Sequence, residues 1–222
     1  MIKYKLIKSK RKTISITVDI NGNIVVKAPL KASKNDVDYF LREKQDWIAK
    51  HVVIQRENAE KREQFLKSHI TTLTYLGKEY PVDYNEPYGF DTKHFTFPDY
   101  TFEQLRPSII GFYKKAAKKH ISERVEYYAP IVGVTPTAVK INSAKTRWGS
   151  CSGKGSLNFS WKLMLADESV LDYVVVHELC HMKQMNHSPK FWAEVKKVFP
   201  DYLKRRNDLK AVQHKITLEC WE

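Results

Sequence analysis

The chain has 222 residues, of which 42% are apolar, and this is enough to bury a core as one large domain or as two small ones. No run of about 18 apolar residues occurs, and residues 1–5 lack the apolar stretch of a secretory signal, so we expect no membrane-spanning helix and no export. The three cysteines lie far apart in sequence, which argues against a disulfide framework and indicates a cytoplasmic protein.

The net charge of +13 at pH 7 favours a polyanionic partner such as nucleic acid or a nucleotide. Two groups of cations are candidates for such a surface. They are Lys114, Lys115, Lys118 and Lys119 in one predicted helix, and Lys204, Arg205 and Arg206 in another. The simpler alternative for both groups is a solvated helix face, because basic residues are spread along the chain and interleaved with acids.

Residues 1–100 predict a β-rich subdomain that contains a helix. Alternation of apolar and polar residues predicts its first strands, over 2–6, 14–20 and 24–26. Asn21-Gly22-Asn23 separates the second and third of these strands and favours a tight hairpin turn.

The helix of this subdomain begins at Ser33. Asp36 stands three residues later, in the spacing of a capping box, and the helix is expected to run into the charged stretch 56–67. A further hairpin is expected over 72–84. The segment 85–101, rich in proline and aromatic residues, is then interpreted as the boundary between two subdomains.

Residues 101–222 predict a second subdomain that opens with a long helix. Its apolar residues keep helical spacing over 102–129, and Pro130 is expected to stop it. Two strands are expected next, over 138–142 and 156–161.

Three elements complete this subdomain. Asp167 or Ser169 is placed to cap a strongly apolar helix, and Ser188 followed by Pro189 starts another that runs to about Phe199. The remaining residues predict a short basic helix and a last strand over 215–218.

The apolar helix carries the motif that indicates the chemistry, His177-Glu178-Leu179-Cys180-His181. Residues four apart lie one helical turn from each other, so His177 and His181 share a face and can bind one metal ion. Glu178 is then placed beside a metal-bound water, where a carboxylate acts as the general base. A catalytic zinc site needs three protein ligands and one open position.

His187 supplies the third candidate ligand. Its spacing from His181 matches three-histidine zinc sites of the metzincin type, in which a glycine lets the chain bend. Gln184 stands where that glycine is expected, so the bend must arise otherwise. Asn186 tolerates the left-handed conformation and is predicted to supply it.

Tyr173 to Trp192, together with the Arg-Trp-Gly-Ser-Cys segment of residues 147–151 and the segment 157–161, resembles the YgjP-like metallopeptidases, relatives of the SprT-like proteases. The resemblance extends to the N-terminal segment around residues 15–18. It implies an α+β fold: a zincin-like catalytic domain with the HExxH helix and a small antiparallel sheet, and an N-terminal β-rich part. It also implies His177, His181 and His187 as zinc ligands and Glu178 as the catalytic residue.

Other candidates have structural alternatives. Arg147 can stabilise an oxyanion or bind a substrate carboxylate or phosphate, or it can anchor the hairpin through backbone carbonyls. Trp148, Trp161 and Trp192 are interpreted as core residues, and Cys180 as a small buried side chain. Cys151 is close enough in sequence to approach the metal, but a fourth protein ligand would close the site.

Three functions fit these features. The first is a zinc peptidase that holds an extended peptide along the edge of the strand 157–161. The second directs the same zinc and water at a phosphoanhydride or phosphoester, whose phosphates the basic balance would bind. The third is a nucleic-acid-binding module with structural zinc, which the intact Glu178 and the three-ligand set argue against.

Overall fold

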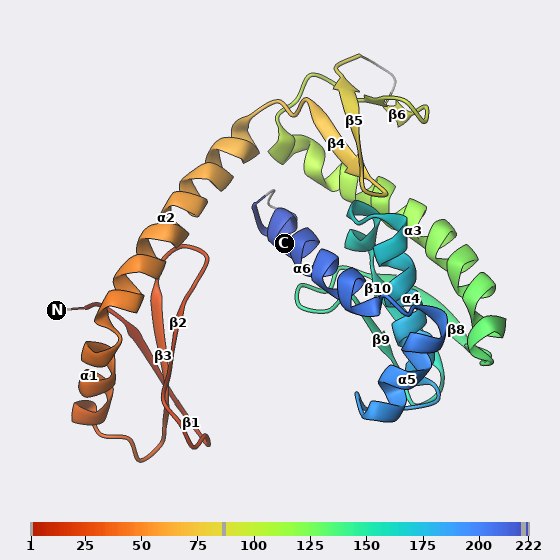
Figure 1. The fold of residues 1–222 in the computed structure, drawn as a ribbon. Helices are drawn as coiled ribbons and strands as arrows, with labels where there is room; N and C mark the ends of the chain where they lie inside the picture. Colours follow the sequence, from red (N-terminus) through yellow and green to blue (C-terminus); the bar gives the residue numbers. More distant parts are fainter. Residues whose placement is uncertain (1, 86–87, 219–220, 222) are drawn as a thin grey trace. The chain divides into compact units, whose positions relative to one another are not determined.

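The computed structural model describes residues 2–85, 88–218 and 221, and it divides into two compact units, Met1–Phe65 and Leu66–Glu222 (Figure 1). The division lies well before the boundary that the sequence suggested near residue 100. Residues 66–100 belong to the second unit because their hairpin packs on the helices that follow it.

The first unit consists of a three-stranded sheet and two helices. Its elements are β1 (Lys5–Ser9), β2 (Ser15–Val18), β3 (Ile24–Pro29), α1 (Lys34–Glu43) and α2 (Gln45–Lys67), the last of which continues two residues into the second unit. Strand β3 lies in the centre, antiparallel to β2 and parallel to β1. The core is formed by apolar side chains of β3 and the two helices, namely Val26, Ala28, Val37, Leu41 and Ile48.

Local sequence signals predicted the turn and the helix start of this unit, but not the boundary between its two helices. The hairpin between β2 and β3 is confirmed, with Gly22 in the left-handed region at φ 79°. The capping box of Ser33 and Asp36 is also confirmed. The single helix expected after it is instead two helices, because the backbone leaves helical geometry at Lys44 (φ −103°, ψ 13°).

The second unit contains two small sheets and four α-helices within the described residues. Its elements are β4 (Thr72–Tyr75), β5 (Lys78–Asp83), β6 (Gly89–Phe90), β7 (Phe95–Thr96), α3 (Phe102–Val132), β8 (Ala138–Asn142), β9 (Gly149–Cys151), β10 (Ser156–Ser160), the 3-10 helix η1 (Trp161–Leu165), α4 (Glu168–His181), α5 (Pro189–Val198) and α6 (Tyr202–Leu218). The fold is α+β, as the resemblance implied.

The first of these sheets, in the order β4-β5-β7-β6, is anchored to the start of α4 by its hairpin. The hairpin turns at Leu76 and Gly77, whose φ values are 48° and 75°. A methyl group on Gly77 would lie 2.3 Å from Asp167 Oδ1, so only glycine permits this approach. The Leu76 amide also donates to the Met164 carbonyl at 2.7 Å.

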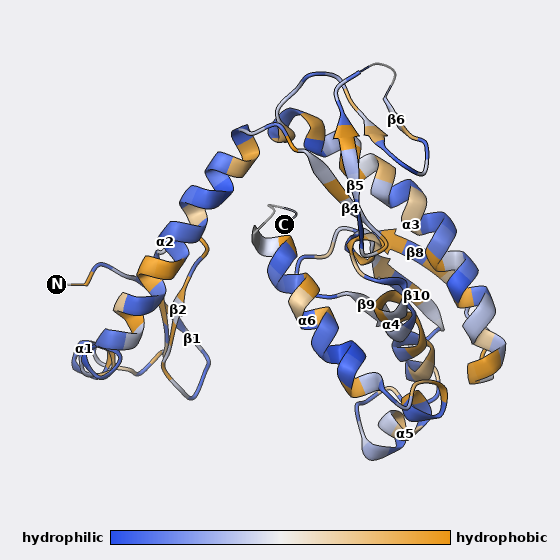
Figure 2. Ribbon diagram, turned by 45° about the horizontal axis from the view of Figure 1, so that its top comes forward, coloured by the Kyte–Doolittle hydropathy of each residue, from blue (hydrophilic) through white to orange (hydrophobic). Residues whose placement is uncertain are grey.

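Helix α4 forms the centre of the second unit. Leu171 and Val175 are fully buried, and α4 packs against α3, whose Ile121 is also fully buried. Figure 2 shows α4 as largely hydrophobic, whereas α6 is mostly hydrophilic. The buried Asp172 of α4 accepts two hydrogen bonds of 2.6 Å from Arg124 of α3. This pair ties the two helices together at a buried position.

The second sheet has the order β8-β10-β9, so β10 is central and β9 is an edge. β10 is parallel to β8 and antiparallel to β9, which makes the sheet mixed and not antiparallel as expected. The expectation that residues 157–161 offer a free strand edge is therefore wrong. The edge belongs to β9, which the sequence did not predict because a three-residue strand shows no alternation.

Two further expectations need correction. Pro130 does not stop α3, which continues to Val132 and ends at Gly133 with φ 77°. A proline in the last turn removes only one backbone hydrogen bond, and the left-handed glycine ends the helix. Residues 215–218 are not a strand but the last turn of α6, where Ile216 is buried. Within the described ranges, none of the helices combines the length and apolar character needed to span a membrane.

Candidate metal centre

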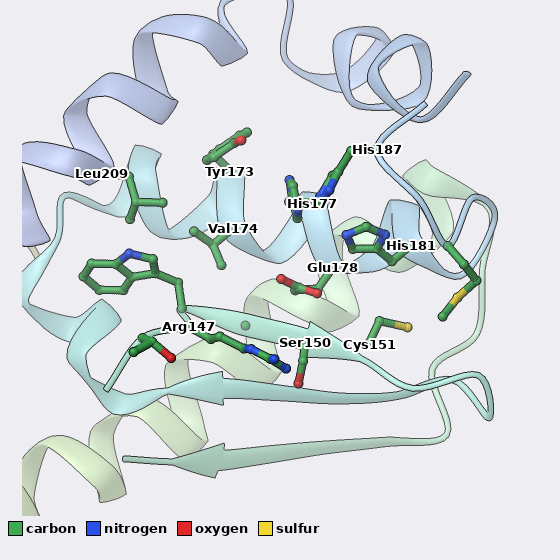
Figure 3. Close-up of a pocket in the computed structure, with 14 residues that line it drawn as sticks. Arg147, Ser150, Cys151, Tyr173, Val174, His177, Glu178, His181, His187 and Leu209 are labelled. Atoms are coloured by element: carbon green, nitrogen blue, oxygen red, sulfur yellow. Dashed lines mark hydrogen bonds between the residues drawn. The ribbon is translucent and has the colours of Figure 1, made fainter. Parts of the chain in front are cut away.

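The HExxH motif lies at the C-terminal end of α4, and three histidines meet there (Figure 3). His177 and His181 come from the helix, and His187 comes from the connection to α5. The Nε2 atoms of His177 and His187 are 3.0 Å apart. One ring nitrogen of each histidine lies within 4.8 Å of the other two, so one metal ion can be shared among them.

The connection after α4 turns without a glycine and without the expected left-handed asparagine. The Gln184 amide donates to the Cys180 carbonyl at 3.0 Å, which closes the end of the helix. Among the described non-glycine residues, only Leu76 and Thr92 have positive φ, so Asn186 does not supply the bend. The Gln184 carbonyl lies 3.1 Å from His181 Nδ1, and donation from that nitrogen leaves Nε2 available for a metal.

Aromatic rings hold the histidines in place. Phe191 of α5 is fully buried and stacks on His181, with ring centroids 4.5 Å apart. Trp192 stacks on His187 at 5.6 Å and on Tyr202 at 5.2 Å. The start of α5 therefore fixes the ring orientations, and the Ser188-Pro189 signal that begins this helix is confirmed.

The electrostatics favour neutral imidazoles. Burial, followed by the neighbouring His181 and His187, lowers the pKa of His177 to about 3. Burial also lowers the pKa of His181. Neutral histidine is the form that binds metals, so no proton has to be displaced from His177 at neutral pH.

Glu178 is buried, with 5% of its surface exposed, and burial raises its pKa to about 7. Figure 3 shows its carboxylate between α4 and the strand that carries Ser150 and Cys151. That strand, β9, comes very close to it: a methyl group on Gly149 would lie 2.6 Å from Glu178 Oε1. A carboxyl group with a pKa near 7 is suited to gain and lose a proton at neutral pH.

A cavity of about 430 Å³ opens in front of these residues. One wall is a stripe of α4, comprising Tyr173, Val174, His177, Glu178 and His181. The opposite wall is residues 146–151, and Met185, His187 and Leu209 complete the lining. This volume is within the range of about 300–1,000 Å³ that is typical of small-ligand sites.

The remaining residues that the sequence singled out lie partly in the cavity wall and partly in the core. Arg147 is exposed and lines the cavity. Trp161 and Cys180 are buried core residues, as expected. Trp148 lines the cavity, so its interpretation as a core residue is wrong. Cys151 lines the cavity too, but the metal-capable group within the described residues contains only the three histidines.

The basic residues of α3 and α6 are on two separate helices. Lys114, Lys115, Lys118 and Lys119 of α3 are exposed, and Lys118 Nζ donates to the Val139 carbonyl. On α6, Arg205 pairs with Asp201 at 3.0 Å and stacks over Phe199, and Arg206 stacks over Trp192. These two arginines therefore pack on aromatic rings of their own fold, which is a structural use of their charge.

Sequence reasoning missed three residues of the site. Gly149 was included only as part of a family segment, although glycine in a strand often marks a close approach of another group. Tyr173 stands four residues before His177, so helical spacing alone places it on the same face. No local signal indicates Leu209, because it reaches the cavity only through the packing of α6 on α4.

Comparisons with known proteins relate this chain to one family of peptidases. A model of the YgjP-like metallopeptidase domain matches residues 12–212. The chain is similar to the crystal structure of the metallopeptidase zymogen abylysin of Pyrococcus abyssi, at 27% identity over 43% of this chain and 94% of that chain, with a TM-score of 0.39. It is also similar to the metallopeptidase zymogen jannalysin of Methanocaldococcus jannaschii, at 26% identity over 43% and 92% of the two chains, with a TM-score of 0.35. No curated protein matches significantly. Because the family model spans nearly the whole chain, this protein belongs to the YgjP-like metallopeptidase family.

Proposed function

We propose that this protein is a zinc-dependent peptidase in which His177, His181 and His187 hold the ion and Glu178 is the general base. The observation that carries the proposal is the juxtaposition of three clustered histidine nitrogens with a buried carboxylate whose pKa is about 7. The three imidazoles, two of them kept neutral by burial, are the donor set that zinc prefers. When bound, a zinc ion supplies a Lewis acid that polarises the peptide carbonyl and activates water.

The protein's own residues perform the proton transfers. Glu178, in its carboxylate form, accepts a proton from the attacking water and later delivers it to the departing amine. Because Gly149 has no side chain, there is space for this carboxylate next to β9. Burial of Glu178 keeps the transferred proton away from bulk water. The exposed Arg147 at the cavity wall is assigned the role of stabilising the negative charge that develops on the carbonyl oxygen.

The composition of the cavity favours peptide over phosphate chemistry. Among the described lining residues, Arg147 is the single Lys or Arg. A phosphoanhydride would bring several negative charges and would need more cations or a second metal ion to bind them. An extended peptide instead needs a strand edge and apolar contacts, and edge strand β9 lines this cavity.

The decisive experiment compares zinc-loaded protein with its Glu178→Gln variant on a peptide library and on a panel of nucleotides. The expected result is cleavage of peptides by the wild-type protein alone, with equal zinc content in both proteins. Glu168→Gln is the matched control, because Glu168 stands on the same helix but is exposed. Undiminished cleavage by Glu178→Gln, or hydrolysis of nucleotides in place of peptides, would contradict the proposal.

The role of Arg147 has its own test. Arg147→Ala should lower kcat by about a hundredfold while KM changes little, as expected for a donor that acts mainly in the transition state. Arg147→Lys should restore part of that loss. A rise in KM with unchanged kcat would instead show that Arg147 only binds the ground-state substrate.

A further inference from the structure

The cavity in front of Glu178 has two chemically different ends. Figure 3 shows Leu209 and Val174 on one side of Glu178, and His181 and Cys151 on the other. The side with the histidines is polar. The opposite side is lined by Tyr173, Val174 and Leu209, whose surfaces are apolar apart from the Tyr173 hydroxyl.

The apolar end is built from two separate parts of the chain. Val174 and Tyr173 stand one turn before His177 and Glu178 on α4, and each is only 3% exposed. Leu209 projects from α6. Leu209 remains only partly buried, so it keeps apolar surface available to a ligand.

Apolar side chains around an open cavity select apolar ligands. An acidic or amide side chain placed there would lose its hydration without gaining hydrogen bonds, which makes its burial unfavourable. A leucine or phenylalanine side chain has no hydrogen bonds to water to lose, and burying its apolar surface is favourable. The neighbouring turn of α4 holds Glu178, so a side chain in the apolar end lies next to the reacting carbonyl.

We propose that the apolar end of this cavity holds a large apolar side chain of the substrate beside the cleaved peptide bond, and that Leu209 is a residue that sets this preference. The inference rests on the peptidase activity proposed above. It names the substrate class of the site: extended peptides with leucine, phenylalanine or a similar residue at one position next to the cleaved bond.

Two measurements test this specificity. In the first, zinc-loaded wild-type protein digests a peptide library in which every residue type occurs at every position, and mass spectrometry locates the cleaved bonds. We expect at least about a tenfold preference for large apolar residues at one position flanking the bond. In Leu209→Asp, that preference should disappear, and lysine or arginine should become favoured at the same position.

The second measurement separates binding from catalysis. Zinc-loaded Glu178→Gln protein is titrated, by fluorescence anisotropy, with labelled peptides that differ only in one residue, either leucine, phenylalanine, aspartate or lysine. Leucine and phenylalanine peptides should bind at least about tenfold more tightly than the aspartate peptide. If wild-type protein cleaves no peptide while this binding preference is present, the proposed catalysis fails and the apolar subsite stands.

Control variants distinguish a local effect from misfolding. Leu203→Asp places the same charge on the same helix at a residue that is 59% exposed and does not line the cavity, so its cleavage profile should equal that of the wild type. Leu209→Trp fills the apolar end without adding charge and should shift the preference toward alanine and valine. The specificity proposal is overturned if a folded Leu209→Asp keeps the wild-type profile, or if the four labelled peptides bind equally.

Discussion

Gly149 of β9 faces the side chain of Glu178 so closely that a methyl group at residue 149 would lie 2.6 Å from both Cγ and Oε1 of the glutamate. Real side-chain carbons do not approach other atoms to this distance, so either the strand or the carboxylate would have to move. Glu178 is buried against the sheet and has little room to adjust. The absence of a side chain at Gly149 is therefore a condition for the observed position of the proposed general base.

Gly149→Ala is expected to lower kcat by about a hundredfold or more, because displacing a general base forfeits a contribution of about 10²–10⁴ to the rate. Zinc content should stay unchanged, since the three histidines are not displaced. Steady-state kinetics and metal analysis on the same samples test both statements. Gly153→Ala is the control, because a methyl group there would meet nothing within 4 Å. Normal turnover in Gly149→Ala would show that the close contact is irrelevant to catalysis.

Glu178 should also make the stability of the metal-free protein depend on pH. Burial raises its pKa from an ordinary value of 4.5 to about 7. A carboxyl group whose pKa is raised on folding stabilises the folded state below its unfolded pKa, and this contribution is lost as the pH rises through the folded value. Above pH 7 the buried charge is therefore a cost that the variant Glu178→Gln does not carry.

The two proteins should differ in their free energy of unfolding at high pH but not at low pH. At pH 8, Glu178→Gln should raise the free energy of unfolding of the metal-free protein by up to roughly 3 kcal/mol, and at pH 4 by almost nothing. Urea unfolding in the presence of a chelator measures both values. Because His177 is common to the two proteins, its own titration cancels in the comparison. An equal effect at pH 4 and pH 8 would contradict the assignment of the raised pKa to Glu178.

Of the three proposed metal ligands, His187 is the one whose replacement should leave the core undisturbed. It is exposed and lies outside α4, whereas His177 and His181 belong to the buried helix. His187→Ala should weaken zinc binding by more than about a hundredfold, because two imidazoles rarely hold the ion firmly. Competition with a chromophoric chelator measures the affinity. His214→Ala, at an exposed position of α6, should bind zinc as the wild type does.

The pair of the half-buried Arg124 and the buried Asp172 should matter more than the exposed pair of Lys197 and Glu194. Arg124→Met would leave the carboxylate of Asp172, 9% of whose side chain is exposed, without its cation and is expected to cost about 3–5 kcal/mol of stability. Lys197→Met breaks the ion pair with Glu194, where the lysine is 67% exposed, and should change stability by at most about 0.5 kcal/mol. Denaturant unfolding of both variants measures the two stability losses. Similar losses would mean that burial of the first pair has no energetic consequence.

The basic face of α3 provides the prediction about a polyanionic partner. If Lys114, Lys115, Lys118 and Lys119 contact phosphates, affinity for a DNA duplex should fall with salt, with a slope of about −0.9 per contact. Neutralising all four should flatten that slope while zinc content stays unchanged. Fluorescence anisotropy over a series of salt concentrations is the measurement.

The matched control for this surface neutralises four exposed lysines elsewhere, namely Lys61, Lys93, Lys154 and Lys210. A loss specific to the α3 lysines supports a binding face. Equal losses in both sets would indicate that only the overall charge of the protein matters. The absence of binding at low salt would leave these lysines as a solvated helix face.

The local features of this protein were predictable from the amino-acid sequence. Helical spacing was enough to put His177 and His181 on one face, because that relationship depends only on the geometry of a single helix. The hairpin at Gly22, the capping box at Ser33 and the start of α5 at Ser188 were predictable for the same reason. Each of these depends on hydrogen bonds and dihedral angles among residues a few positions apart.

The distant segments that complete the site could not be identified without the three-dimensional fold. The contact of Gly149 with Glu178 and the arrival of Leu209 from α6 depend on packing between segments separated by about thirty residues. The position of β9 at the sheet edge depends on its pairing with β10. Local patterns also misplaced the end of α3, because Gly133 and not Pro130 ends the helix. Side-chain periodicity records which face of an element is apolar, but it does not record which partner covers that face. That choice depends on the combined packing of α3, α4, α6 and the sheet, and no segment specifies it alone.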